Sequence, residues 1–146
     1  RRYYDERLKN LEGWFSFAMI DMDNFKHIND RFGHQAGDAA LYRAAQAIKS
    51  QIRSDDELVR YGAMNSSCCS ATCRSILEKK LQSIRAALDE IVIEEYPEPY
   101  ISASIGGAFA AGRILRTIRR ADLAMYQAKL KKDCVAIYRE AKERET

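Results

Sequence analysis

The stretch DMDNFKHINDRFGHQAGD, residues 21–38, carries most of the polar chemistry from which a function can be predicted. It begins at the end of WFSFAMIDM, residues 14–22, an aromatic and apolar run of strand length that is too short for a typical helix. From Asp38 onward apolar residues recur at helical spacing, and Asp38 is placed to cap that helix. The stretch is therefore predicted to be a loop between a buried strand and a helix.

The rest of the chain alternates strand-like and helix-like segments. Apolar patterns predict strands at 57–61, at 100–105 before Gly106-Gly107 and at 135–138, and helices at 76–91 and 114–132. Residues 67–73 are small and polar, which predicts an irregular strand there. This alternation favours an α/β domain with a central sheet, and such sheets bind ligands at the loops beyond their strand ends.

Length and composition favour one domain. A chain of 146 residues with 47% hydrophobic content can bury its own core, and a net charge of +3 gives no reason to expect a nucleic acid polymer as partner. No apolar run approaches the ~20 residues of a membrane span, so we expect a cytoplasmic domain. The charged residues 1–12 are predicted to end a helical linker, which leaves open attached sensor or effector domains and a membrane anchor in the full-length protein.

Several polar residues of the stretch suit a nucleotide. Asp21 and Asp23 would face one side of a strand end and offer oxygen ligands to Mg²⁺, although an isolated D-x-D more often marks a turn. Lys26 adds a point charge for phosphate. Asn29 and Asp38 combine an amide and a carboxylate, which match the donor and acceptor edge of guanine, although each alone is commonly a cap or turn residue.

The longer stretch IDMDNFKHINDRFGHQAGDAAL, residues 20–41, resembles the GGDEF domains of bacterial diguanylate cyclases. Their usual pattern is close to D-x-D-x-F-K-x-I-N-D-x-x-G-H-x-x-G-D-x-x-L. The resemblance continues through LVRYG at 58–62, SASIGGAF at 102–109 and RADLAMYQAK at 120–129. It implies an α/β (α+β) fold with a central, mostly antiparallel sheet of about five strands wrapped by helices, akin to the palm of nucleotidyl cyclases.

The resemblance also implies roles for individual residues. It makes Asp21 a magnesium ligand together with the backbone carbonyl of Met22, and it makes Asn29 and Asp38 the pair that reads guanine. The residues implied to line the phosphates are Asn24, Phe25, Lys26 and Lys129. Bound GTP would therefore come with Mg²⁺.

Position 133 departs from the family. An arginine often found four residues after the lysine that corresponds to Lys129 is replaced here by Asp133. Lys131 and Lys132 are close enough in the chain to substitute for it in part.

The motif that names the family is altered. G-G-[DE]-E-F is replaced by GAMNS, residues 62–66, so that Met64 and Asn65 stand where the family has two acids. In the family reaction the 3′-hydroxyl of one GTP attacks the α-phosphate of another, helped by metal ions that those acids bind. General base catalysis alone is worth about 10²- to 10⁴-fold, so the sequence predicts a catalytically inactive domain without catalytic residues. An active cyclase that tolerates the variant motif, with Asp23 or Glu57 reaching the metal, is the alternative.

A second motif concerns regulation. Arg53-Ser54-Asp55-Asp56 is an R-x-x-D before Gly62 at the spacing at which GGDEF proteins carry an inhibitory site for cyclic di-GMP. Alone, such a motif usually marks a solvated turn with an ion pair of ~0–1 kcal/mol. Arg74 or Arg85 from the following helix are candidates to complete the pocket.

The predicted function is thus a regulatory module. It binds cyclic di-GMP through Arg53 and Asp56, or GTP through Asn29 and Asp38, and passes the signal to attached domains. Active relatives work as pairs, so a homodimer is a further expectation. A purely structural domain that binds nothing is the third alternative.

Overall fold

The computed structural model of the chain describes residues 16–53, 57–61, 64–69, 74–96, 101–109 and 114–139. The predicted linker at residues 1–12 lies outside this part of the chain. None of the helices found in the described residues is both long and apolar enough to cross a bilayer.

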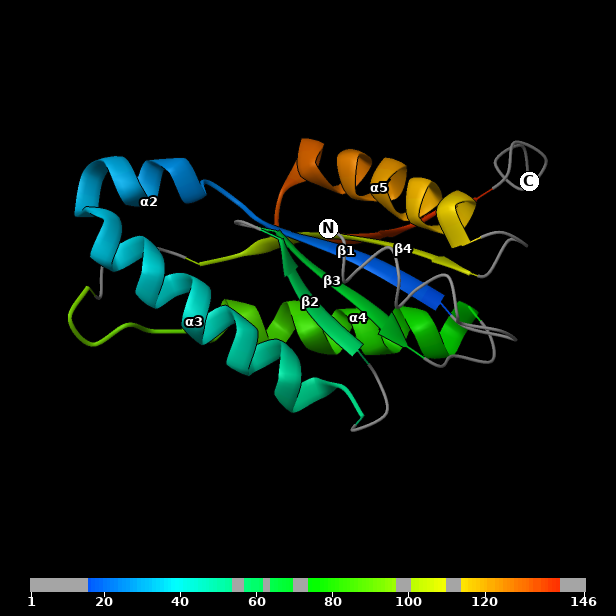
Figure 1. Cartoon of the computed structure of the whole chain (residues 1–146), viewed down its shortest axis with the longest axis horizontal. Helices are drawn as coiled ribbons and strands as arrows, with labels where there is room; N and C mark the ends of the chain where they lie inside the picture. The colour runs from blue at the N-terminus through cyan, green and yellow to red at the C-terminus, as the bar shows by residue number, and fades with distance from the viewer. Residues whose placement is uncertain are drawn as a thin grey trace.

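A five-stranded sheet forms the middle of the domain, in the order β2-β3-β1-β4-β5 (Figure 1). Its strands are β1 (Ser16–Met22), β2 (Glu57–Tyr61), β3 (Met64–Cys69), β4 (Ala103–Phe109) and β5 (Cys134–Ile137). The central strand β1 is antiparallel to both of its neighbours, and the edge strand β5 runs parallel to β4. The prediction of a mostly antiparallel sheet of about five strands is confirmed.

Helices cover both faces of the sheet. The helix α5 (Ile114–Lys131) lies on one face, and α3 (His34–Gln51) and α4 (Arg74–Asp89) lie on the other (Figure 1). The main core fills the second face, where Ile20 of β1, Leu41 of α3 and Leu81 of α4 belong to one buried cluster. Because strand side chains alternate, the neighbouring residues of β1 face α5.

Two consecutive glycines let helices approach β4 from both sides. A Cβ atom at Gly106 would overlap the backbone of α5 at Ala121 and Met125, and one at Gly107 would lie 2.6 Å from Leu81 Cδ1 on α4. The prediction that the strand closes at these glycines is wrong, because β4 runs through them to Phe109. Close helix packing, and not a turn, requires glycine here.

Residues 21–38 are mostly helical, which corrects the prediction of a loop. The helix α2 (Phe25–Phe32) follows β1 directly, and Gly33, with φ of 94°, connects it to α3. The helix α3 therefore begins at His34, and Asp38 lies inside it instead of capping its N-terminus. The signal that identifies α2 is the apolar spacing of Phe25, Ile28 and Phe32.

The strand β3 is more regular than its composition predicts. It pairs with β1 without interruption from Met64 to Cys69, so the prediction of an irregular strand is wrong for that part. Pairing on both edges, to β1 and to β2, compensates for the low strand propensity of its serines and cysteines. Residues 70–73 lie outside the described residues.

Candidate functional site

Asp23 follows β1 and is almost fully buried, with 1% of its surface exposed. Its Oδ2 accepts hydrogen bonds from the Ser102 hydroxyl at 2.7 Å and from the Asp133 backbone N–H at 2.8 Å, and its Oδ1 accepts one from the Ser104 hydroxyl at 2.6 Å. Three donors offset the cost of burying a carboxylate. Asp23 therefore joins β1, β4 and the turn after α5, and both of its oxygens are already engaged. This leaves Asp21 as the metal candidate of the D-x-D pair.

Asp21, at the end of β1, forms an ion pair with Lys129 of α5. The carboxylate side chain is 13% exposed and the lysine side chain 41% exposed. Burial of the ammonium group, and then repulsion from Lys132, lower the pKa of Lys129 below that of an ordinary lysine. One carboxylate and two ammonium groups thus meet at this end of the sheet.

Asn24 connects β1 to α2 in the left-handed conformation, with φ of 58°. Lys132, from the turn after α5, donates a hydrogen bond from Nζ to Asn24 Oδ1 at 2.8 Å. Phe25 is half-buried against the core, whereas Lys26 is exposed at the start of α2. Two of the residues implied to line the phosphates, Asn24 and Lys129, therefore lie on neighbouring elements. Asn24 is bonded to Lys132, just after α5, and Lys129 of α5 is paired with Asp21 at the end of β1.

The predicted guanine pair lies on two adjacent helices. The side chain of Asn29 in α2 packs on the backbone of Gly37 in α3, so closely that a Cβ atom at Gly37 would overlap Asn29 Oδ1. The same atom would lie 3.3 Å from Phe25 Cζ. Asp38 is the next residue and is exposed. The absence of a side chain at Gly37 thus lets Asn29 pack on α3 at the residue that precedes Asp38.

The neighbouring strand β3 places residues opposite Asp21. In the β1–β3 ladder Met64 pairs with Asp21, and Asn65 pairs with Ile20. Residues directly opposite each other share a face of the sheet, with Cβ atoms about 4.5–5.5 Å apart. Position 64 therefore belongs to the face of Asp21, where a carboxylate would complete a pair of acids, and position 65 belongs to the face of the buried Ile20. Methionine is a soft ligand and does not suit Mg²⁺.

The donor set at the end of β1 fits Mg²⁺ only together with a phosphate ligand. Among the described residues no three His, Cys, Asp or Glu side chains come together to hold a metal ion. Mg²⁺ is commonly bound by one or two carboxylates, with substrate phosphates and waters completing the octahedron. Asp21 and the carbonyl of Met22 agree with such a site, which would depend on the nucleotide.

The predicted cyclic di-GMP site is described only in part. Arg53 is exposed just after α3, and Asp56 lies outside the described residues, as does the side chain of Arg74. Arg85 of α4 donates to Asp89 at 2.8 Å and to Asp133 at 3.3 Å. These contacts tie Arg85 to α4 and to the turn after α5.

Sequence reasoning missed the two serines that bind Asp23. Ser102 and Ser104 come just before and within the start of β4, two residues apart. The sequence signal that could have found them is a Ser-x-Ser at one strand end and a D-x-D at another. Residues two apart in a strand lie on the same face of the sheet, so each pair can present both side chains together. Only the register between β1 and β4 shows that they meet.

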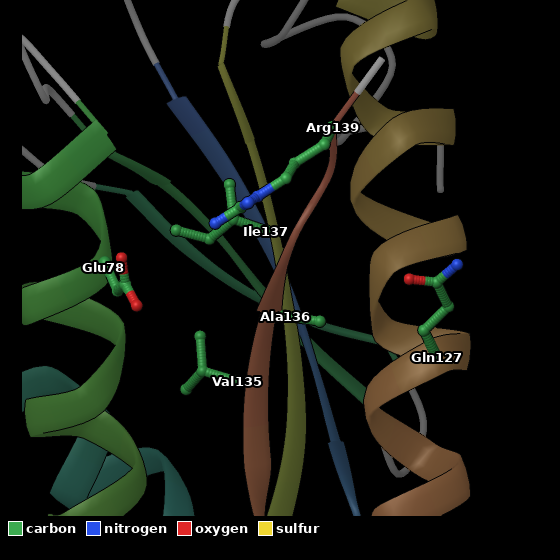
Figure 2. Close-up of a pocket in the computed structure, with 6 residues that line it drawn as sticks. All are labelled: Glu78, Gln127, Val135, Ala136, Ile137 and Arg139. Carbon is green, nitrogen blue, oxygen red and sulfur yellow. The ribbon is translucent and has the colours of Figure 1, made fainter. Parts of the chain in front are cut away.

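A pocket at the sheet edge contains none of the predicted site residues (Figure 2). It lies beside β5, where Val135 and Ile137 point toward α4 and Ala136 points toward α5. The other lining residues are Glu78, Gln127 and Arg139. This pocket is therefore separate from the cluster at the end of β1.

Comparison with known proteins identifies the family. Residues 2–133 match the family described as diguanylate cyclase, GGDEF domain. Because the match covers most of the chain, the protein belongs to the GGDEF family of diguanylate cyclases, as the resemblance of residues 20–41 implies.

Individual relatives agree with this assignment. Diguanylate cyclase A of Treponema denticola is 32% identical over 123 residues, which cover 78% of this chain and 32% of that protein. Diguanylate cyclase DgcS of Shewanella oneidensis is 41% identical over 69 residues, covering 42% of this chain and 23% of that protein. The chain thus spans about a third or less of the length of these relatives.

The fold agrees as well. The crystal structure of the GGDEF domain of DgcB from Caulobacter crescentus in complex with c-di-GMP matches with a TM-score of 0.85 and 25% sequence identity. The match covers 94% of this chain and 89% of that one. The predicted fold is therefore confirmed.

Proposed function

We propose that this domain binds a guanine nucleotide as a regulatory module and converts GTP to cyclic di-GMP very slowly or not at all. The observation that carries the proposal is the register of β3, which sets Met64 opposite Asp21. One metal-binding carboxylate remains at that point of the sheet, where two would be needed to hold metal and to activate a hydroxyl.

Binding is supported by the residues that remain. Asn29 and Asp38 lie on adjacent helices and offer amide and carboxylate groups to guanine, and Lys129 brings a cation to the phosphates. Asp21 and the Met22 carbonyl would hold Mg²⁺, which would supply positive charge to offset that of the phosphates. Packing of Asn29 on Gly37 prepares this arrangement before the ligand arrives.

Calorimetry and chromatography test the two parts of the proposal separately. The purified domain should bind GTP in the presence of Mg²⁺, and prolonged incubation should yield no cyclic di-GMP. Measurable magnesium-dependent product from the wild-type chain would contradict the loss of catalysis. Absence of heat with both GTP and cyclic di-GMP would contradict the binding role.

A gain-of-function variant sharpens this test. The double substitution Met64→Glu and Asn65→Glu returns acids to both positions and should raise cyclase activity above that of the wild type by about 10²-fold or more. The single variant Asn65→Glu is the matched control, because position 65 belongs to the other face of β3 and should gain much less. Equal activity of the two variants would show that the register does not explain the defect.

Cyclic di-GMP is the second candidate ligand, because the similar domain from Caulobacter crescentus was crystallised with it. Arg53 follows α3 and would pair its guanidinium with a phosphate of the dinucleotide. Arg53→Ala should abolish binding of cyclic di-GMP and leave binding of GTP unchanged. Arg43→Ala, which removes the same charge from an exposed position of α3, is the control. An unchanged affinity in Arg53→Ala would remove the assignment of that site.

A further inference from the structure

The turn between α5 and β5 contains two residues in an unfavourable conformation. Lys132 and Asp133 have φ of 62° and 47°, in the left-handed region that suits glycine and is disfavoured for side chains with a Cβ atom. Such conformations persist where surrounding contacts hold them, and they are frequent at functional sites. A lysine at the first of these positions therefore calls for a physical reason.

Contacts from three elements hold the turn. The backbone N–H of Asp133 donates to the buried carboxylate of Asp23 at 2.8 Å, and the side chain of Asp133 accepts from Arg85 at 3.3 Å. The backbone N–H of Lys132 donates to the carbonyl of Ala128 at 2.9 Å. The backbone of Lys132 is thus held on both sides, which sets the direction of its Cα–Cβ bond.

That direction brings the ammonium group of Lys132 to the start of α2, where it lies 2.8 Å from Asn24 Oδ1. Lys129 approaches the same end of β1 and pairs with Asp21. Lys129 and Lys132 thus bring two positive charges to the same end of β1. A phosphate bound between them would neutralise both charges, and the neutral amide of Asn24 does not.

We propose that Lys132 is a phosphate-binding residue of the nucleotide site, which acts beside Lys129 and is held in place by Asp23 through the Asp133 turn. The inference rests on the proposed function and adds to it a specific contact with the phosphate chain of GTP. It also gives Asp23 a role as a positioning residue, since its carboxylate binds the turn and not the ligand.

The variant Lys132→Gly separates this role from a structural one. Glycine relieves the left-handed strain, so the melting temperature should be equal to or higher than that of the wild type. Loss of the ammonium group should weaken GTP binding about fivefold, with a smaller loss for GDP and none for guanosine, as measured by calorimetry with Mg²⁺. A merely structural lysine would give the opposite result, a lower melting temperature with unchanged affinity.

Two further variants control for the general effect of charge. Arg43→Ala removes a positive charge from an exposed position of α3, and Lys49→Ala removes one from the last turn of the same helix. Both should change GTP affinity less than twofold. A loss with Lys49→Ala equal to that with Lys132→Gly would overturn the proposal, because it would indicate an unspecific field.

The outcomes also distinguish this inference from the proposed function. If the wild type binds GTP and Lys132→Gly binds it equally well, only the role of Lys132 is rejected. If the wild type binds no GTP at all, the proposed GTP site is rejected, and the role of Lys132 with it.

Discussion

The central strand β1 meets two different neighbours at its acidic end. On the side of β4, Asp23 is buried and satisfied by Ser102, Ser104 and the turn after α5. On the side of β3, Asp21 faces Met64, and its charge is balanced by Lys129 of α5. The two aspartates of one D-x-D pair thus differ: Asp23 is satisfied by three buried or partly buried donors, and Asp21 is the one that we propose as a metal ligand.

The difference separates a structural contact from the groups of the proposed nucleotide site. Asp23 connects elements far apart in the sequence, so its removal would affect the whole fold. The acids expected opposite and beside Asp21 would serve a reaction, and the sheet forms without them because β3 pairs through its backbone. A fold of this kind can therefore form without acids at these two positions, as the proposed loss of catalysis requires.

The largest effect is expected from Asp23→Ala. The change leaves two buried hydroxyl groups and one partly buried backbone N–H without their acceptor and should lower the free energy of unfolding by about 3–5 kcal/mol, as measured by urea denaturation. Asp21→Ala is the matched control two residues away, and it should cost about 1 kcal/mol or less because its partner Lys129 is partly exposed. Equal costs would abolish the distinction between the two aspartates.

A smaller effect is expected from Gly37→Ala. The new methyl group would displace Asn29 and should weaken GTP binding about tenfold, or about 1.4 kcal/mol, whereas the better helix propensity of alanine limits the change in stability. Gly33→Ala has the opposite signature. Its Cβ atom meets nothing within 4 Å, but φ of 94° is strained for alanine, so stability should fall and affinity should stay within about twofold.

Next comes Arg85→Ala, which tests how far α4 supports the turn. Arg85 bonds to Asp89 and Asp133, and all three side chains are partly exposed. Its removal should cost about 0.5–1 kcal/mol in thermal or urea unfolding. Most of this loss should disappear in 1 M salt, because partly exposed ion pairs are screened. A loss as large as that of Asp23→Ala would mean that the ion pair, and not Asp23, holds the turn.

The smallest effect concerns pH. Burial, and then repulsion from Lys132, lower the pKa of Lys129 below its reference value of 10.5, so this ammonium loses its proton at a lower pH than a fully solvated lysine. Phosphate binding should be complete below that pKa and weaken as pH rises through it. In Lys129→Arg the charge persists, so the GTP affinity of the wild type should fall about threefold relative to this variant between about pH 7 and pH 10. Parallel profiles would exclude Lys129 from the phosphate contacts.

Much of the fold and part of the site follow from local patterns. The sheet was predicted from the apolar run of β1 and from the helical spacing of α4 and α5. The family was predicted from the motif in residues 20–41, and the sequence GAMNS at 62–66 already shows that two acids of the family motif are absent. The helix α2 and the passage of β4 through Gly106 were not predicted. The apolar spacing of α2 is obscured by the many polar residues between its apolar positions. The sequence predicts a strand end at Gly106 because glycines usually mark turns, except where an element packs closely on a strand.

The sequence by itself determined the family, the strands and helices, and the absence of acids at positions 64 and 65. Only the tertiary structure decided that Asp23 is structural, that position 64 shares a face with Asp21, and that Lys132 reaches Asn24. These contacts join residues 81 and 108 positions apart in the chain, as for Ser104 with Asp23 and Lys132 with Asn24. Periodicity reports which face a residue takes within its own element, whereas sheet register and helix packing decide which faces meet.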